Sequence, residues 1–206
     1  LSTGASQFET LENLLKEEVA WHKVTMFHLD EYVGLPDTHP ASFRKYLKER
    51  FVQKTNLQNV FFVNGERDVH ANIKMLTEEL HRETVDVGVI GIGENGHIAF
   101  NDPPADFETK DAYKVVRLDL RCKQQQVGEG WFATVEDVPD KAISMTVSEI
   151  LSCAHIVTAV PHRVKADAIY ATITGEINPM VPATILKTHR DWRLFTDDES
   201  ASKLFG

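Results

Sequence analysis

Apolar residues recur along most of the chain at spacings that predict helices alternating with strands. Apolar positions three and four residues apart predict amphipathic helices at 6–19, 39–52, 68–83 and 161–175. Short apolar runs between them predict buried strands at 24–29, 57–63, 85–92 and 155–160. Ser6 and Glu9 have the spacing of a capping box at the start of the first helix. The alternation predicts an α/β domain: a three-layer, Rossmann-like fold with a mainly parallel sheet and helices on both faces.

The apolar pattern predicts further elements at 141–197, but it is weak after Pro104. The spacing predicts a strand and a short helix at 141–154, a short helix at 182–189 and a last strand at 192–197. After Pro104 the periodicity weakens: 112–120 favours a strand, but the residues that follow are polar and interrupted by glycine. We expect 103–132 to form a mobile lid over a ligand site.

No repeat, low-complexity tract or linker divides the chain, so 1–206 is expected to form a single domain. Hydrophobic residues make up 42% and charged residues 26%, which is typical of a globular protein. The sequence opens on Leu1, within a stretch that resembles a loop leading into a helix. We therefore expect that an N-terminal strand is missing from this numbering.

The charge balance and the lack of long apolar runs limit the expected partners. A net charge of −9 argues against nucleic acid, whose phosphates require clustered Lys and Arg. A small anion stays open, since backbone N–H groups at a helix start and one or two cations can hold it. No apolar run approaches the roughly 18–20 residues of a membrane helix, so we expect no membrane partner. Cys122 and Cys153 show neither metal-binding spacing nor a disulfide framework, which favours a reduced, cytoplasmic setting.

Polar residues with useful chemistry lie near the predicted strand ends, where ligands bind in open α/β sheets. One such stretch precedes the first helix and consists of small and hydroxyl residues: Thr3, Gly4, Ala5 and Ser6. It could hold an anion at the positive end of the helix, although the loop taken alone favours a plain helix cap. A second stretch places Asp30 and Glu31 directly after the strand at 24–29, where a buried carboxylate and a solvated turn are both open.

A third loop contains Asn95, His97 and Asp102. A histidine followed by an acid five residues later can form an oriented acid/base pair, while a loop histidine bonded to backbone is the alternative. Lys165 lies in the first turn of the helix after 155–160, where a cation opposes the helix dipole. A bound phosphate would explain that lysine, and a solvated surface position is the alternative.

The segment "GIGENG", from Gly91 to Gly96, matches the glycine pattern of dinucleotide-binding loops, but its context does not. That fingerprint requires a helix that opens at the third glycine and an acidic residue about 20 positions later. Here Pro103 and Pro104 leave at most about two helical turns after Gly96. We therefore expect a different kind of ligand loop.

Two motifs together carry a resemblance to a known family. "LDEYVGLPDTHPASF" and "GIGENGHIAFNDPP", with weaker support from "STGAS" and "VPHRVKADAI", resemble the glucosamine-6-phosphate deaminase family. That family lies within the superfamily that also contains the 6-phosphogluconolactonases. The likeness runs from Leu1 nearly to the C-terminus, and the continuation "IAFN" after His97 favours the aminosugar branch.

The resemblance implies a cofactor-independent, metal-free conversion of an aldohexosamine 6-phosphate to a ketohexose 6-phosphate and ammonia. Asp30 matches the general base that moves a proton between C2 and C1, and His97 matches the group that assists ring opening. Asn95 and Asp102 match the residues that orient this histidine. The positions that match the family's phosphate-binding residues are Thr3, Gly4, Ala5, Ser6 and Lys165.

The chain also departs from the family pattern. Asn95 stands where several members carry Asp, and Asp102 stands where Glu is usual. The phosphate-binding arginine of the lid has no clear match; Gln124–Gln126 occupy the region where it is sought. The residues of the allosteric site of enteric members are not evident around Ala112–Val115, so we expect no such allostery.

Several alternatives stay open at this stage. The substrate is expected to be a small sugar phosphate, glucosamine 6-phosphate or its epimer galactosamine 6-phosphate. A 6-phosphogluconolactonase that uses His97 to activate water is a same-fold alternative. A catalytically weak sugar-phosphate-binding module is the alternative from another class. Homo-oligomer formation is also left open.

Overall fold

The computed structural model describes residues 1–205, and within them the strands form three sheets. β1 (Thr25–Phe27) pairs in parallel with β3 (Asn59–Phe61). The second sheet is also parallel and has the order β4 (Val87–Val89), β7 (His155–Val160), β8 (Trp192–Thr196). The third is antiparallel and has the order β2 (Asp30–Tyr32), β6 (Lys141–Met145), β5 (Tyr113–Arg117).

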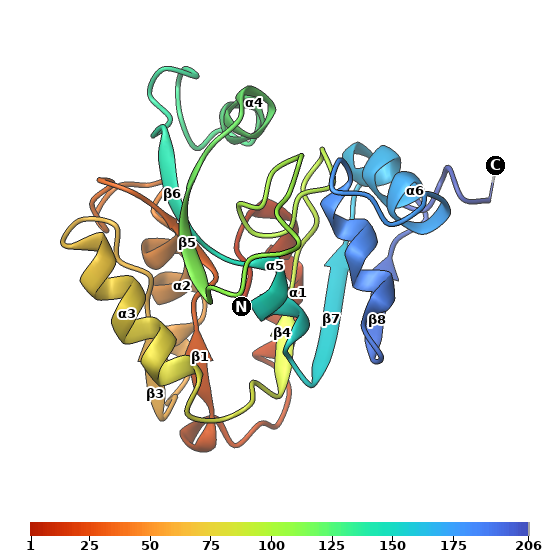
Figure 1. Cartoon of the computed structure of the whole chain (residues 1–206). Coiled ribbons are helices and arrows are strands. Elements are labelled where there is room, and N and C mark those ends of the chain that lie inside the picture. The colour runs from red at the N-terminus through yellow and green to blue at the C-terminus, as the bar shows by residue number, and fades with distance from the viewer. Residues whose placement is uncertain (206) are drawn as a thin grey trace.

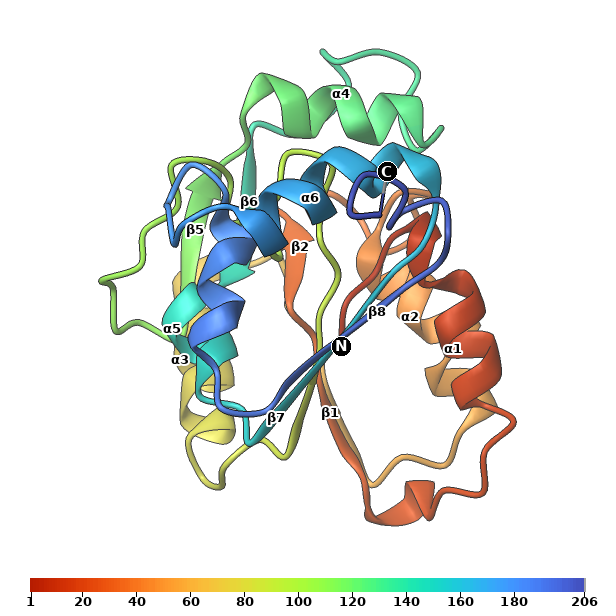
Figure 2. The ribbon, with the colours of Figure 1, turned by 90° about the vertical axis from the view of Figure 1, so that its right-hand side faces the viewer.

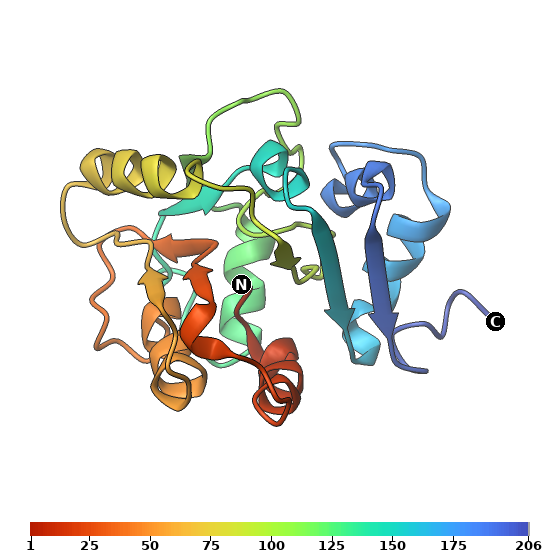
Figure 3. The ribbon, with the colours of Figure 1, turned by 90° about the horizontal axis from the view of Figure 1, so that it is seen from below.

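Helices lie on both sides of the parallel strands, as the alternating pattern predicts (Figure 1). Figure 3 shows α1 (Phe8–Leu14) and α2 (Phe43–Arg50) on one side, and α3 (Val69–Leu80) and α5 (Val147–Leu151) on the opposite side. α6 (Ala166–Thr174) follows β7, and α4 (Leu120–Gly128) crosses one end of the molecule (Figure 2). The 3-10 helices are η1 (Ala5–Gln7), η2 (Trp21–Lys23), η3 (Val52–Lys54), η4 (Arg163–Lys165) and η5 (Pro182–Thr188).

The largest apolar core fills the space between the strands and the helices that cover them. Ile90, Ile143 and Ile156 lie at its centre and are almost wholly buried. A second cluster packs α4 against the antiparallel sheet, and a third joins α1 to α2. The predicted α/β fold with parallel sheets flanked by helices is confirmed.

Two local features differ from those that the sequence predicts or leaves open. The solvated turn left open for Asp30 and Glu31 is not what forms, since Asp30–Tyr32 is a buried strand paired with Ser144–Ala142 of β6. Ser6 does not cap the first helix: Gly4 and Gln7 occupy the N-cap positions of η1 and α1, and neither makes a side-chain capping bond. The reason is that the chain enters the helix through a 3-10 turn, which moves the start of α1 to Phe8.

The polar segment after 112–120 is also more regular than its sequence indicates. Its first part is β5, and most of its second part is α4 rather than irregular chain. Asp119 caps α4, since its carboxylate accepts a hydrogen bond of 2.6 Å from the Cys122 amide. Only Cys122 and Gln126 of this helix are buried, so its apolar periodicity is too weak to recognise.

β1 and β4 belong to separate sheets, and the first two residues of the chain bridge them at one end. The Leu1 amine donates to the Phe27 carbonyl at 3.0 Å, and the Ser2 amide donates to the Val89 carbonyl at 2.9 Å. An apolar cavity of about 300 Å³ continues between the two strands. The N-terminal strand expected from the sequence stays a prediction.

Candidate active site

A pocket of about 60 Å³ lies beyond the carboxyl ends of β4 and β7, beneath α4. Most of the predicted site residues line it, although they come from distant parts of the sequence. From the predicted set it contains Thr3, Gly4, Ser6, Asp30, His97 and Lys165. Asn95 and Asp102 do not line the pocket and lie behind His97, and Ala5 lies in the pocket-lining loop without lining it.

Asp30 is the first residue of β2, and only 6% of its surface is exposed. Burial raises the pKa of its carboxyl to about 7, and the neighbouring Glu31 carboxyl adds to the rise. A carboxyl with a pKa near neutrality can both accept and return a proton at the pH of a cell.

Glu31 points away from the pocket, because successive side chains of a strand alternate between faces. Its carboxylate accepts hydrogen bonds from the Ser42 hydroxyl at 2.8 Å and the Arg44 amide at 2.9 Å. The Arg44 guanidinium lies 3.3 Å from the same carboxylate, and both side chains are buried. The two adjacent acids of the sequence therefore separate into a pocket residue and a residue that holds the start of α2.

Replacing Glu31 with alanine is expected to lower the free energy of unfolding by about 3–5 kcal/mol, because the Ser42 hydroxyl and the amide and guanidinium of Arg44 would lose their shared buried acceptor, and only the guanidinium keeps a second carboxylate, that of Glu66 at 2.6 Å. Urea denaturation near neutral pH measures this loss. Glu49→Ala is the matched control, since it removes only the exposed pair with Lys45 and should cost about 1 kcal/mol or less. Similar losses for the two variants would contradict a structural role for Glu31.

Asn95 fixes the orientation of His97. The Asn95 Oδ1 atom lies 2.6 Å from His97 Nδ1 and also accepts from the His97 amide at 3.1 Å. Its Nδ2 donates to Asp102 Oδ1 at 3.3 Å, so the oxygen must be the atom that faces the ring. His97 Nδ1 therefore carries the proton, and in the neutral ring Nε2 is left free to accept one.

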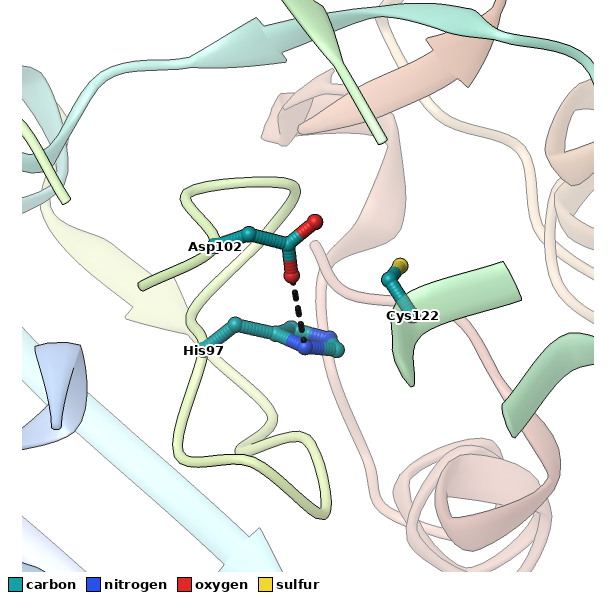
Figure 4. Close-up of side chains that lie close together, drawn as sticks. All are labelled: His97, Asp102 and Cys122. Atoms are coloured by element: carbon teal, nitrogen blue, oxygen red, sulfur yellow. Dashed lines mark ion pairs between the residues drawn. The ribbon is translucent and has the colours of Figure 1, made fainter. Parts of the chain in front are cut away.

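Asp102 reaches His97 despite its short side chain. Its Oδ1 atom lies 3.3 Å from His97 Nδ1, and its Oδ2 accepts from the Asp119 amide at 3.3 Å (Figure 4). Burial alone would raise the pKa of Asp102, but the hydrogen bonds from His97 and Asn95 hold it below its usual range. Asp102 is thus a carboxylate placed behind the histidine, next to the asparagine that contacts the ring.

The glycines of "GIGENG" serve this histidine rather than a nucleotide. A Cβ added to Gly93 would come within 2.2 Å of the His97 ring, so only glycine allows the ring to lie there. Gly96 has a φ of +82°, a conformation that favours glycine, and its amide donates to the Gly93 carbonyl at 3.0 Å. The expectation that this loop is not a dinucleotide fingerprint agrees with the close turn that it forms.

The pocket also contains groups suited to an anion. Thr3, Gly4, Ser6 and Lys165 line it together. Lys165 is only 5% exposed, which excludes the solvated surface position left open by the sequence. Burial lowers its pKa, while the charges of Glu129 and Glu94 oppose the fall. A phosphate bound here would favour the charged form of this lysine.

Three residues of the α4 region also line this pocket: Gln125, Gln126 and Glu129. The sequence placed the two glutamines only in the region of the lid and did not indicate Glu129. Gln126 Oε1 accepts a hydrogen bond of 2.8 Å from the Tyr32 hydroxyl. This bond leaves the Gln126 amide N–H₂ for the pocket, in the region where the family's lid arginine was sought. The spacing of Asp119, Cys122 and Gln126 was the one available signal of the helix that carries them.

In the described part of the chain, 1–205, none of the helices has both the length and the apolar character of a membrane span.

A family profile described as glucosamine-6-phosphate isomerases/6-phosphogluconolactonase matches residues 1–195. The glucosamine-6-phosphate deaminase of Clostridium acetobutylicum is 35% identical over 212 residues, which cover 99% of this chain and 86% of that protein. The glucosamine-6-phosphate deaminase of Streptococcus pneumoniae serotype 4 is 32% identical over 205 residues, with the same coverage.

Solved structures agree with these sequence matches. A monomeric glucosamine-6-phosphate deaminase of the NagB superfamily superposes with a TM-score of 0.88 at 30% identity, over 98% of this chain and 86% of that one. A 6-phosphogluconolactonase from Thermotoga maritima superposes with a TM-score of 0.73 at 13% identity, over 94% and 81%, a likeness of fold alone. This protein therefore belongs to the family of glucosamine-6-phosphate isomerases and 6-phosphogluconolactonases.

Proposed function

We propose that the protein is a deaminating aldose–ketose isomerase that converts glucosamine 6-phosphate to fructose 6-phosphate and ammonia. One observation carries the proposal: a carboxyl with a pKa near 7 faces the same small pocket as an oriented histidine and a buried lysine. Two curated relatives that match 99% of this chain are named for this deamination, which supports the choice of reaction.

The residues divide the chemistry between them. His97 Nε2 accepts the proton of the C1 hydroxyl and returns a proton to the ring oxygen, which opens the sugar to its aldehyde. Asp30 then removes the proton on C2 while the C1 oxygen gains a proton that the substrate ammonium gives up, which forms an enolamine. Asp30 delivers its proton to C1, which leaves an alcohol at C1 and an iminium group at C2. Water adds to C2 and ammonia leaves, which yields the ketose. Asn95 and Asp102 hold His97 in the tautomer that the first step requires.

The phosphate binds in the same pocket, where it positions C1 and C2 without taking part in the reaction. We assign its binding to the loop Thr3-Gly4-Ala5-Ser6 and to Lys165. The Gln126 amide adds a neutral donor from α4. Because α4 closes the pocket and lies within 103–132, we propose that this segment opens to admit the substrate.

Removing the Lys165 amino group should mainly weaken substrate binding. A charge-assisted hydrogen bond to phosphate contributes about 1.5–3 kcal/mol, so Lys165→Ala should raise KM by roughly 10- to 100-fold. The value of kcat should change much less, since the proposed role of the lysine is to bind the phosphate and not to move a proton. Steady-state kinetics measures both. Lys203→Ala is the matched control, because Lys203 pairs with Asp167 on α6 at the surface. A fall in kcat at unchanged KM would contradict the assignment.

The pH dependence of kcat/KM should report the Asp30 carboxyl. As a base it must be deprotonated, so kcat/KM should fall about tenfold per pH unit below its pKa of about 7. Binding of inorganic phosphate, measured over the same range, corrects for titration of the phosphate-binding groups. A rate that stays flat down to about pH 5 would contradict a base with this pKa.

Substrate assays separate the remaining candidates. Ammonia release from glucosamine 6-phosphate and from galactosamine 6-phosphate identifies the epimer that is used. Hydrolysis of 6-phosphogluconolactone tests the lactonase alternative, which the likeness of fold alone supports. Thermal stabilisation by these ligands without turnover of any would favour a binding module and overturn the proposed activity. A cytoplasmic location stays a prediction.

A further inference from the structure

Cys122 lies in the first turn of α4 and faces the residues behind the catalytic histidine. Figure 4 shows its sulfur next to the paired side chains of His97 and Asp102. One ligand atom from each of the three lies within 4.8 Å of the other two. Cys122 is only 1% exposed, and the proposed reaction gives its thiol no role. This cluster could not be predicted from the sequence, because Cys122 lies on a helix whose apolar periodicity is too weak to recognise.

The three side chains are the ligand types that borderline and soft divalent cations prefer: imidazole nitrogen, carboxylate oxygen and thiolate sulfur. We propose that His97, Asp102 and Cys122 bind a thiophilic divalent cation of the Zn²⁺ class and that the bound ion stops turnover. Cation binding stands on the geometry of the cluster, whereas the block of turnover rests on the proposed function. Such a site would be regulatory and not part of the catalytic cycle.

The geometry requires only a small adjustment. Zinc lies about 2.0–2.3 Å from such ligands, so the ligand atoms of a tetrahedral site lie about 3.3–3.8 Å apart. His97 Nδ1 and Asp102 Oδ1 are already separated by 3.3 Å. Cys122 belongs to α4, the helix that we propose moves with the lid, so it is the ligand that can approach. The fourth position would be open to water or a substrate oxygen from the pocket.

The charges around the sulfur also favour a cation. Burial raises the pKa of the Cys122 thiol, and the carboxylates of Asp102 and Asp119 raise it further. These groups make the thiolate unfavourable on its own. A dication reverses the balance, because it neutralises the carboxylate charge and displaces the thiol proton. Cation binding at this cluster should therefore release protons to the solvent.

The bound ion would block the first step of the reaction. Binding at His97 Nδ1 displaces the proton that now faces Asn95 Oδ1. The neutral ring keeps this proton by moving it to Nε2, so Nε2 becomes a donor and no longer accepts the proton of the C1 hydroxyl. Substrate binding through the phosphate would be affected much less than turnover.

Cadmium is a suitable probe, since a thiolate bound to Cd²⁺ gives an ultraviolet charge-transfer band whether or not the enzyme is active. We expect the full chain to bind one Cd²⁺ with this band. Cys122→Ser should lose the band, and Asp102→Asn should weaken the affinity by about tenfold or more. Cys153→Ser is the matched control, because Cys153 is the other buried free thiol and lies outside the cluster; this variant should keep the band.

Activity measurements complete the test. Zn²⁺ should inhibit the wild-type and Cys153→Ser proteins, and the activity left in Cys122→Ser should resist Zn²⁺ by at least tenfold in concentration. Circular dichroism shows whether Cys122→Ser is folded; if it is not, the affinity of Asp102→Asn decides. A wild-type protein without the band, or a band lost in Cys153→Ser alone, overturns the metal site. Cadmium binding without aminosugar turnover overturns the proposed function and leaves the metal site standing.

Discussion

Asp30→Asn is expected to lower kcat by about 10³-fold while leaving phosphate binding nearly unchanged. Asparagine keeps the size and polarity of the side chain but cannot accept the C2 proton. Asp30 is not among the groups to which we assign the phosphate, so inorganic phosphate should bind the variant with an affinity within about twofold of wild type. Ammonia release and phosphate titration measure the two quantities. A variant that keeps near-normal turnover would show that another group is the base.

The same substitution should stabilise the protein at alkaline pH. The pKa of Asp30 is raised from 3.8 to about 7 in the folded chain, so the folded state holds this proton more tightly than the unfolded state. Stability is then lost as pH rises from about 4 to about 7, and the full cost of roughly 4 kcal/mol applies above that range. Asparagine has no such cost. Asp30→Asn should therefore unfold at higher urea than wild type at about pH 8, and the gain should vanish near pH 4.

A surface control separates this effect from a general change of charge. Asp198 is exposed near the C-terminus, and Asp198→Asn should shift the urea midpoint little at either pH. If Asp30→Asn is no more stable than wild type at alkaline pH, the carboxyl is not as strongly desolvated as its burial indicates. Loss of activity together with a gain of stability would identify Asp30 as a group kept for function at a structural cost.

Most residues of the pocket could be predicted from the sequence, because a single rule on where ligands bind in α/β sheets applies to them. Ligand groups gather beyond the carboxyl ends of parallel strands, and Lys165 and the His97 loop follow β7 and β4. The position of Asp30 could not be predicted by this rule alone. Asp30 and Glu31 face opposite sides because they belong to strand β2, whereas the sequence also allows a turn there. Pairing of β2 with β6 joins segments more than a hundred residues apart, and no local pattern encodes such a contact.

The α4 region escaped prediction for a different reason. The Tyr32 hydroxyl of β2 binds Gln126, and Cys122 of α4 faces Asp102, which lies in the loop after β4. These tertiary contacts give the two residues their buried positions. A helix whose inner face is built from glutamine and cysteine does not show the apolar period on which sequence reasoning depends. The side of the pocket formed by the α4 region, and with it the proposed metal cluster, could therefore be identified only from the structure.

His97→Gln should lower kcat by about 10²- to 10⁴-fold, the contribution typical of a positioned acid/base group. Glutamine fills similar space and can donate a hydrogen bond, but it cannot carry a proton from the C1 hydroxyl to the ring oxygen. An acyclic analogue, 2-amino-2-deoxyglucitol 6-phosphate, should bind the variant nearly as well as wild type, since it has no ring to open. His70→Gln, at an exposed position on α3, is the control and should leave the rate unchanged.

An isotope effect shows which step His97 serves. Deuterium at C2 slows the proton transfer to Asp30, so it lowers the rate wherever that transfer limits turnover. If His97→Gln makes ring opening the slow step, the isotope effect at C2 should fall towards unity in this variant. Asp30→Glu, which misplaces the base by one methylene, should instead keep or increase the effect. An unchanged or larger isotope effect in His97→Gln would place the histidine in the proton transfer at C2 and not in ring opening.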